Sequence, residues 1–181
     1  MGLTIDQMNL GPLARQGAHA LLAEFGPDVI RFTRGYADLK GQARAMAGNV
    51  ARNKEWIKQT YTRTDRPSYV IACALQEEVY RRAEVKDRAE IEQYLYAALQ
   101  SIPNAEAISF HCLVDVQGQP ASEAFDLLPI EDAHGMPTAE GYRVIASIRR
   151  LPGLDAFLHR EGGLRIWHAQ FMAKTPISKE V

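Results

Sequence analysis

Two histidines in the second half of the chain have side chains and positions that suit a chemical site. His111 lies in the segment 105–116 and His168 in the segment 164–173, and both segments alternate between apolar and polar residues as β-strands do. In each segment the histidine lies on the side opposite to the apolar residues. If the two strands are neighbours in register, the imidazoles converge, with Asp115 on the same side as His111. Two histidines and a carboxylate suit a transition metal or general acid–base chemistry.

This convergence depends on a strand pairing that the sequence does not establish, and half-exposed histidines on a small sheet are usually surface residues. We therefore expect no metal and no cofactor, and we keep His111, His168 and Asp115 as the alternative set of metal ligands. The common motifs of nucleotide-binding, zinc-protease and serine-hydrolase sites are absent from the sequence. Their absence argues against a familiar active site.

The charged residues are distributed unevenly along the chain. Residues 1–88 contain 14 Lys and Arg against 10 Asp and Glu, and residues 143–181 contain seven bases against three acids. The predicted helix and turn between 28 and 66 hold nine bases against four acids, which suits a polyanion such as nucleic acid. A solvated helix face is the alternative, because the bases spread over more than half of the helix circumference. The candidate polyanion-binding residues are Arg31, Arg34, Arg44, Arg52, Lys54, Lys58 and Arg63.

Residues 89–142 contain nine acids and no base, which is the strongest charge feature of the chain. This acidic segment has three interpretations. It complements the basic segments within the fold, it docks a basic partner protein, or it presents phosphate-like charge to a nucleic-acid-binding protein. The candidate residues for a basic partner are Asp115, Glu123, Asp126, Glu131 and Asp132.

Apolar residues with helical spacing predict one long helix over Asp28–Thr62, around which the other elements would pack. From Phe32 to Thr60 one stripe of mostly apolar residues, with Asn53 among them, recurs in alternating steps of four and three residues, which keeps them on one side of a helix. Three glycines in this segment each cost the helix about 1 kcal/mol relative to Ala, so it must be held by packing or it breaks near one of them. These glycines are Gly35, Gly41 and Gly48.

Further helices are predicted from their end signals. One ends at Gly26-Pro27, a second begins near Pro67, and a third begins at Asp87, which has capping-box spacing to Glu90. From residue 105 the apolar pattern becomes alternating, so that 105–128 predicts a β-hairpin. After it we expect a helix capped by Thr138, a short helical piece with Leu154 and Phe157, and a last strand over 164–173.

Helices first and strands later indicate the α+β class. We expect an N-terminal helical bundle around the long helix and a small antiparallel sheet in the C-terminal half, made of the hairpin and the last strand. The chain then divides into a helical part, residues 1–104, an α+β part of order ββααβ, residues 105–175, and a tail, residues 176–181. The first two parts are expected to share one core as a single domain.

The sequence predicts an architecture and a charge layout rather than a reaction. We interpret the chain as a small, soluble, non-enzymatic binding or adaptor protein of the cytoplasm, acting through charged faces on a protein or nucleic-acid partner. It has no secretory signal and no apolar stretch near the ~20 residues of a membrane span, so we expect no membrane contact. A monomer or a small homo-oligomer is expected. The alternative is an enzyme of unknown reaction with His111 and His168 on one sheet face.

Overall fold

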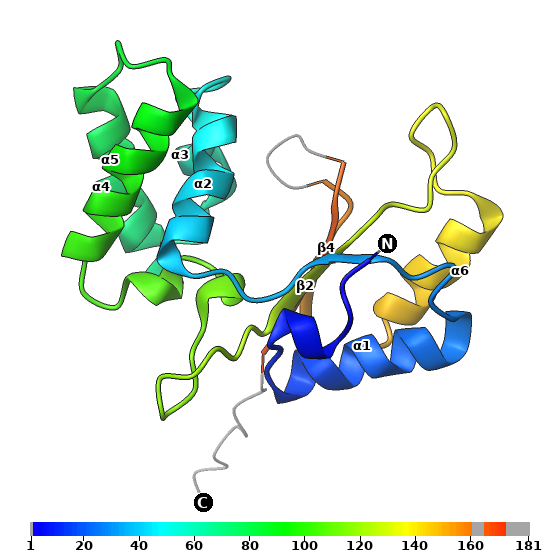
Figure 1. The fold of residues 1–181 in the computed structure, drawn as a ribbon. Coiled ribbons are helices and arrows are strands. Elements are labelled where there is room, and N and C mark those ends of the chain that lie inside the picture. Colours follow the sequence, from blue (N-terminus) through cyan, green and yellow to red (C-terminus); the bar gives the residue numbers. More distant parts are fainter. Residues whose placement is uncertain (1, 161–164, 173–181) are drawn as a thin grey trace, which may run out of the picture.

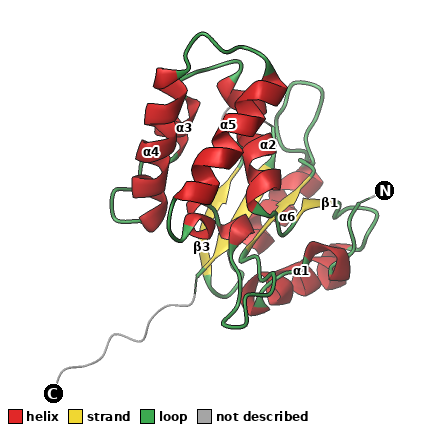
Figure 2. Ribbon diagram, turned by 60° about the vertical axis from the view of Figure 1, so that its left-hand side comes forward, coloured by secondary structure: helices red, strands yellow, loops and turns green. Residues whose placement is uncertain are grey.

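The computed structural model describes residues 2–160 and 165–172. These residues form six α-helices and a four-stranded antiparallel sheet of order β1-β2-β4-β3, so the predicted α+β class is confirmed (Figure 1, Figure 2). The strands are β1 (Phe32–Arg34), β2 (Ala124–Leu127), β3 (Leu154–Leu158) and β4 (Trp167–Phe171). The helices are α1 (Pro12–Phe25), α2 (Leu39–Val50), α3 (Trp56–Thr60), α4 (Pro67–Arg81), α5 (Arg88–Ser101) and α6 (Ala139–Ile148). Short 3₁₀ helices are η1 (Asp6–Met8), η2 (Ala105–Ile108) and η3 (Phe110–Cys112).

Side-chain caps fix the starts of three helices. Asp38 accepts from the backbone N–H of Gly41 at the start of α2, and Thr138 accepts from that of Gly141 at the start of α6. Asp87 accepts from two backbone N–H groups of the first turn of α5. Each cap satisfies amides that have no partner inside the helix. The predicted helix starts at Pro67, Asp87 and Thr138 are confirmed.

The prediction of one long helix over 28–62 is wrong, because the chain there forms β1, α2 and α3. The break lies at Gly35, where the backbone of Met8 approaches so closely that a Cβ would lie 2.3 Å from its carbonyl oxygen. The N–H of Tyr36 donates to this same oxygen at 2.7 Å. This long-range contact and the cap at Asp38 favour a break over the continuous helix that the apolar spacing predicts. Phe32 lies in a strand instead.

The predicted hairpin over 105–128 is half wrong. Its second strand exists as β2, but the first is replaced by η2 and η3. Asn104 has a φ of 56°, and the hydroxyl of Ser109 accepts from the N–H of His111. These local interactions stabilise 3₁₀ turns in place of the strand that the alternating pattern predicts. The helical piece predicted with Leu154 is also wrong, because those residues form β3. The last strand is confirmed as β4, while Leu164, Ala173 and the predicted tail lie outside the described residues.

Buried apolar residues form two clusters. The sheet cluster packs one face of the sheet against α1 and α6 and includes Phe32, Phe125 and Trp167. The helical cluster lies among α2, α3, α4 and α5 (Figure 1). Residues from both ends of the chain meet in the sheet cluster, since α1 and β1 pack there with β4. The division at residue 104 stays a prediction.

Adjacent residues of the central strands face opposite sides of the sheet. Phe125 in β2 and Trp167 and Ala169 in β4 belong to the sheet cluster. Asp126 and His168 therefore project from the other face. The side-chain position predicted for His168, opposite to Trp167 and Ala169, agrees with this arrangement. That face is covered by protein, because Asp126 and His168 are 2% and 4% exposed.

A buried His-Asp-His candidate metal centre

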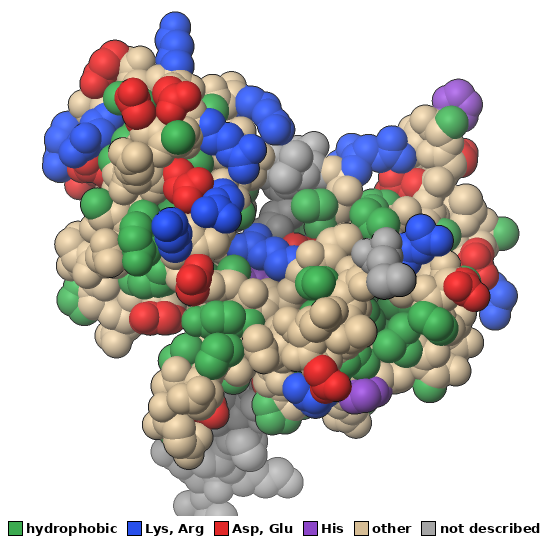
Figure 3. Space-filling view, viewed as in Figure 1, with side chains coloured by type: hydrophobic (Ala, Val, Ile, Leu, Met, Phe, Trp, Pro, Cys, Tyr) green, Lys and Arg blue, Asp and Glu red, His purple; other side chains and the backbone are tan. Residues whose placement is uncertain are grey.

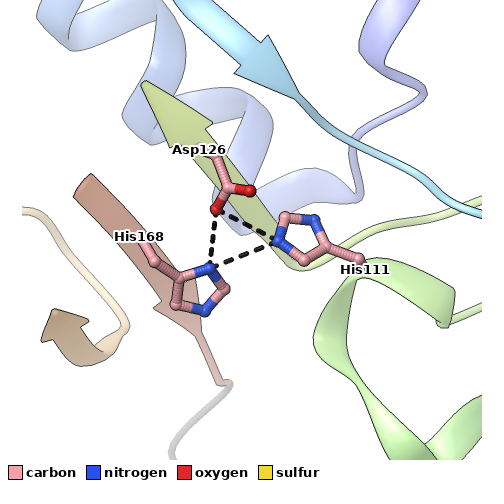
Figure 4. A group of neighbouring side chains, drawn as sticks. All are labelled: His111, Asp126 and His168. Carbon is pink, nitrogen blue, oxygen red and sulfur yellow. Dashed lines mark hydrogen bonds and ion pairs between the residues drawn. The ribbon is translucent and has the colours of Figure 1, made fainter. Parts of the chain in front are cut away.

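Three side chains from separate segments meet beside the central strands of the sheet (Figure 4). Asp126 and His168 are cross-strand partners in the antiparallel pair of β2 and β4. His111 reaches them from η3, and its imidazole lies edge-on to that of His168, with ring centroids 5.0 Å apart. All three side chains are buried, His111 to within 1% exposure. The sheet thus positions two groups, and the 3₁₀ helix brings the third.

The three inner atoms form a nearly equilateral triangle. His168 Nδ1 lies 2.8 Å from Asp126 Oδ1, and His111 Nε2 lies 3.2 Å from both of these atoms. An ion with bonds of about 2.1 Å at right angles holds neighbouring ligand atoms about 3.0 Å apart. The triangle therefore matches one face of an octahedral coordination shell.

The outer ring nitrogens fix the tautomers of both histidines. His111 Nδ1 lies 2.7 Å from the carbonyl oxygen of Gly35, which can only accept, so this nitrogen carries the proton. The amide nitrogen of Gln170 donates to Asp155 at 2.7 Å, so its oxygen faces His168 Nε2, at 3.2 Å. His168 Nε2 then donates to that oxygen. In neutral imidazoles the two inner nitrogens consequently carry lone pairs.

A further ion pair supports this arrangement. Arg66 binds the second oxygen of Asp155 at 2.8 Å, and both side chains are largely buried. The chain of contacts runs from Arg66 through Asp155 and Gln170 to the outer nitrogen of His168. Outer partners of this kind orient the histidine ligands of metal sites and raise their basicity.

Asp126 is ionised in this environment. Burial alone raises the pKa of its carboxyl group, but the positive charge and the hydrogen bonds of protonated His111 and His168 outweigh burial and hold the pKa well below its usual range. A buried carboxylate needs a cation close by, because an isolated charge is very costly away from water. Two inward lone pairs and one carboxylate oxygen therefore require either an added proton on a histidine or a metal cation.

Two cavities reach this cluster from different sides. One, of about 350 Å³, lies beside α2 and is bordered by Asp126. The other, of about 270 Å³, lies between the segment after α3 and the strands β3 and β4, and His168 borders it. The cluster is thus buried by neighbouring side chains while open space lies next to two of its three members.

The structure brings together two of the three residues proposed as alternative metal ligands. His111 and His168 meet, whereas Asp115 lies in an exposed turn, where its carboxylate accepts from the N–H groups of Gln117 and Gln119. Asp126, predicted as part of an acidic surface, is the carboxylate of the cluster. This role was not predicted from the sequence. Alternation gives the face of Asp126, which lies between the apolar Phe125 and Leu127 in a strand that was correctly predicted, but it does not give the strand that pairs with it.

The other acidic candidates have partners within the chain. Glu123 accepts from the N–H of Ala14 in the first turn of α1. Glu131 pairs with Arg165 at 2.7 Å, and Asp132 closes a turn through the N–H groups of His134 and Met136. These contacts fit the interpretation of charges that complement each other within the fold. Docking of a basic partner stays a prediction.

The basic candidates do not share one environment. Three form ion pairs with acidic side chains: Arg44 with Glu92, Lys58 with Glu55, and Arg63 with Asp65. Lys54 donates to the carbonyl oxygen of Val85, and Arg31 is exposed beside β1. Arg34 and Arg52 border the cavity next to Asp126. Polyanion contact by the whole set stays a prediction.

Comparison with known proteins adds no family to these observations. The chain matches no protein-family model, and neither a curated protein nor a solved structure matches it. Within the described part of the chain, no helix has the length and apolar character that crossing a membrane requires.

Replacing Gln170 with Leu tests the outer partner of His168. The change removes the acceptor for His168 Nε2 at nearly constant volume, so we expect divalent-metal affinity to fall by about 10- to 100-fold. Isothermal titration of the metal-free protein with Zn²⁺ measures this. Gln93→Leu, on the exposed surface of α5, is the matched control and should bind as the wild type does. Equal dissociation constants for the two variants would show that Gln170 does not contribute to metal binding.

Proposed function

We propose that this protein is a metal-dependent enzyme whose His111, Asp126 and His168 bind one divalent transition-metal ion. A single observation carries the proposal: one atom each of His111, Asp126 and His168 lies within 3.2 Å of the other two, and the outer nitrogen of each histidine faces an acceptor, so that in neutral imidazoles both inner nitrogens carry lone pairs. A purely structural polar cluster places a donor opposite each acceptor. Here neutral histidines direct two imidazole lone pairs and one carboxylate oxygen at one point.

The donor set indicates the class of ion. Two imidazole nitrogens and one carboxylate oxygen suit Fe²⁺, Mn²⁺, Co²⁺ or Zn²⁺ better than the oxygen-seeking Mg²⁺ and Ca²⁺. Three protein ligands on one face leave further coordination positions open, as catalytic sites do. Such an ion supplies Lewis-acid chemistry at this position. The protein residues hold it, and the buried surroundings strengthen the interaction of the ion with nearby charges.

This proposal develops the enzyme hypothesis rather than the adaptor hypothesis of the sequence. A non-enzymatic binding protein needs an exposed face, and the cluster of His111, Asp126 and His168 is buried beside two cavities. Polar groups that converge next to a cavity are the usual mark of an active site. The adaptor role stays a prediction from charge distribution.

Metal content is the direct test. We expect the protein, purified without a histidine tag and dialysed against Zn²⁺ or Mn²⁺, to retain about one ion per chain by elemental analysis. His111→Ala removes one of three ligands and should retain almost none. His134→Ala, an exposed histidine in a turn, is the control and should retain the wild-type amount. If the wild type binds none of Zn²⁺, Mn²⁺, Co²⁺ or anaerobic Fe²⁺, the cluster is a protonated hydrogen-bonded group and the proposal is wrong.

A further inference from the structure

We infer that the cavity beside Asp126 binds a small oxyanion, a carboxylate or phosphate group of the substrate, next to the metal. This inference rests on the proposed function, because it gives the substrate class of the same site. The cavity of about 350 Å³ is within the usual size range for a small organic ligand. Its walls come from β1, α2, α3 and the start of α5, and Asp126 lies at its inner side.

Three arginines border this cavity: Arg34, Arg52 and Arg88. Among the ion pairs of residues 2–160 and 165–172, none involves these three. Asp126 is the one carboxylate among the described residues that line the cavity, and the histidines hold it. The cavity therefore carries an excess of positive charge without a partner in the described chain.

A β-bulge aims Arg34 at the site. Phe32 pairs with Leu127, but Arg34 pairs with Asp126, so β1 has one extra residue relative to β2. Without the bulge, Arg34 would lie on the same face as Phe32, which belongs to the sheet cluster. The extra residue turns Arg34 to the face of Asp126, and bulges next to active sites commonly re-aim a side chain in this way.

Neighbouring groups hold Arg34 in place. Its guanidinium donates to the side-chain oxygen of Gln42 at 2.8 Å, and the nitrogen of that amide donates to the hydroxyl of Tyr61 at 3.1 Å. The neutral partner orients the guanidinium and leaves its charge uncompensated. A fixed planar fork of N–H donors is well suited to a carboxylate or phosphate group.

The other two arginines enclose the outer part of the cavity. Arg88 lies against α2 at Gly48, where a Cβ would be 3.6 Å from the guanidinium, and Arg52 follows the end of α2. Figure 3 shows Lys and Arg side chains gathered around the hollow between the helical part and the sheet. Apolar groups of Met46, Trp56 and Ile166 complete the walls, which suits an anion with a small organic portion.

Anion titration of the metal-loaded protein tests the inference. Inorganic phosphate and succinate are titrated calorimetrically into the Mn²⁺-loaded wild type, in a chloride buffer of fixed ionic strength. We expect at least one of them to bind, with its dissociation constant raised about 10-fold by Arg52→Gln or Arg88→Gln, since each loses charged hydrogen bonds. Arg31→Gln, an exposed arginine outside this cavity, should bind as the wild type does. Mn²⁺ content should be unchanged in all three variants.

Each outcome has a separate meaning. Binding of phosphate alone supports a phosphorylated substrate, and binding of succinate alone supports an organic acid. Full Mn²⁺ content with no binding of either anion overturns the inference and leaves the metal centre standing. Equal weakening in Arg31→Gln and the cavity variants overturns it too, because general surface charge then explains the binding. Failure to load Mn²⁺ or any other divalent ion defeats the proposed function itself, and with it the inference.

Discussion

We expect that replacing Asp126 with Asn abolishes the thermal stabilisation that a divalent metal ion in the proposed site would give to this protein. The substitution keeps the shape of the side chain but removes the charge that the cation requires, and it places an amide in the ligand triangle. For the wild type, an ion at 100 times its dissociation constant stabilises the folded state by about 2.7 kcal/mol. In a chain of this length that raises the unfolding midpoint by roughly 5–10 °C, and in Asp126→Asn we expect a rise below about 1 °C.

Asp115→Asn is the matched control for this experiment, since Asp115 lies in an exposed turn away from the cluster. It should keep the full metal-dependent rise. The metal-free proteins distinguish the competing interpretation. If a protonated histidine were the permanent partner of Asp126, no metal would raise the wild-type midpoint, and Asp126→Asn would itself cost about 3–5 kcal/mol through loss of a buried ion pair. Differential scanning fluorimetry with and without Zn²⁺ separates these cases.

Phe125→Ala has the largest expected effect on stability. Phe125 is fully buried in β2, with its ring centroid 5.1 Å from that of Phe32 and 5.4 Å from that of Phe171. Truncation leaves a cavity at the centre of the sheet cluster, so we expect a loss of about 3–5 kcal/mol in the free energy of unfolding. Urea unfolding followed by circular dichroism measures this.

Val70→Ala is the control for Phe125→Ala, because Val70 is 70% exposed on α4. A surface substitution of this kind changes the free energy of unfolding by about 0.5 kcal/mol or less. Equal midpoints for the two variants would contradict the central place of Phe125 in the sheet cluster. A loss at Phe125 without change at Val70 supports the packing of β1 against β2 that replaces the predicted long helix.

The sequence predicts those elements whose ends are marked by capping residues or prolines. Pro67, Asp87 and Thr138 mark helix starts because a fixed φ or a side-chain acceptor acts within a few residues. The long helix fails for the opposite reason. Its break depends on the approach of Met8 to Gly35, a contact between segments far apart in sequence that local spacing does not record.

In the candidate site, too, the sequence predicts what nearby residues determine and misses what contacts between distant segments determine. Alternation in β4 places His168 opposite to Trp167, and this part of the site is readable from the sequence. The carboxylate is not, because the partner of β4 is β2, and strand order depends on the whole fold. His111 arrives on a 3₁₀ helix, where its direction is set by the hydrogen bond to Gly35 rather than by alternation. The burial of all three depends on segments far apart in the sequence that pack around this face of the sheet.

The pairing of β2 with β4 links the site to the core. Phe125 lies opposite Ala169 and Leu127 opposite Trp167 on one face of the sheet, while Asp126 lies opposite His168 on the other. A slip of either strand by one residue would expose the aromatic core and, in the same step, turn Asp126 and His168 away from each other. The burial of the apolar residues therefore selects the same register that places Asp126 next to His168. A register of β2 and β4 that separated Asp126 from His168 would also lose the packing of the core, so the molecule would not fold stably in it.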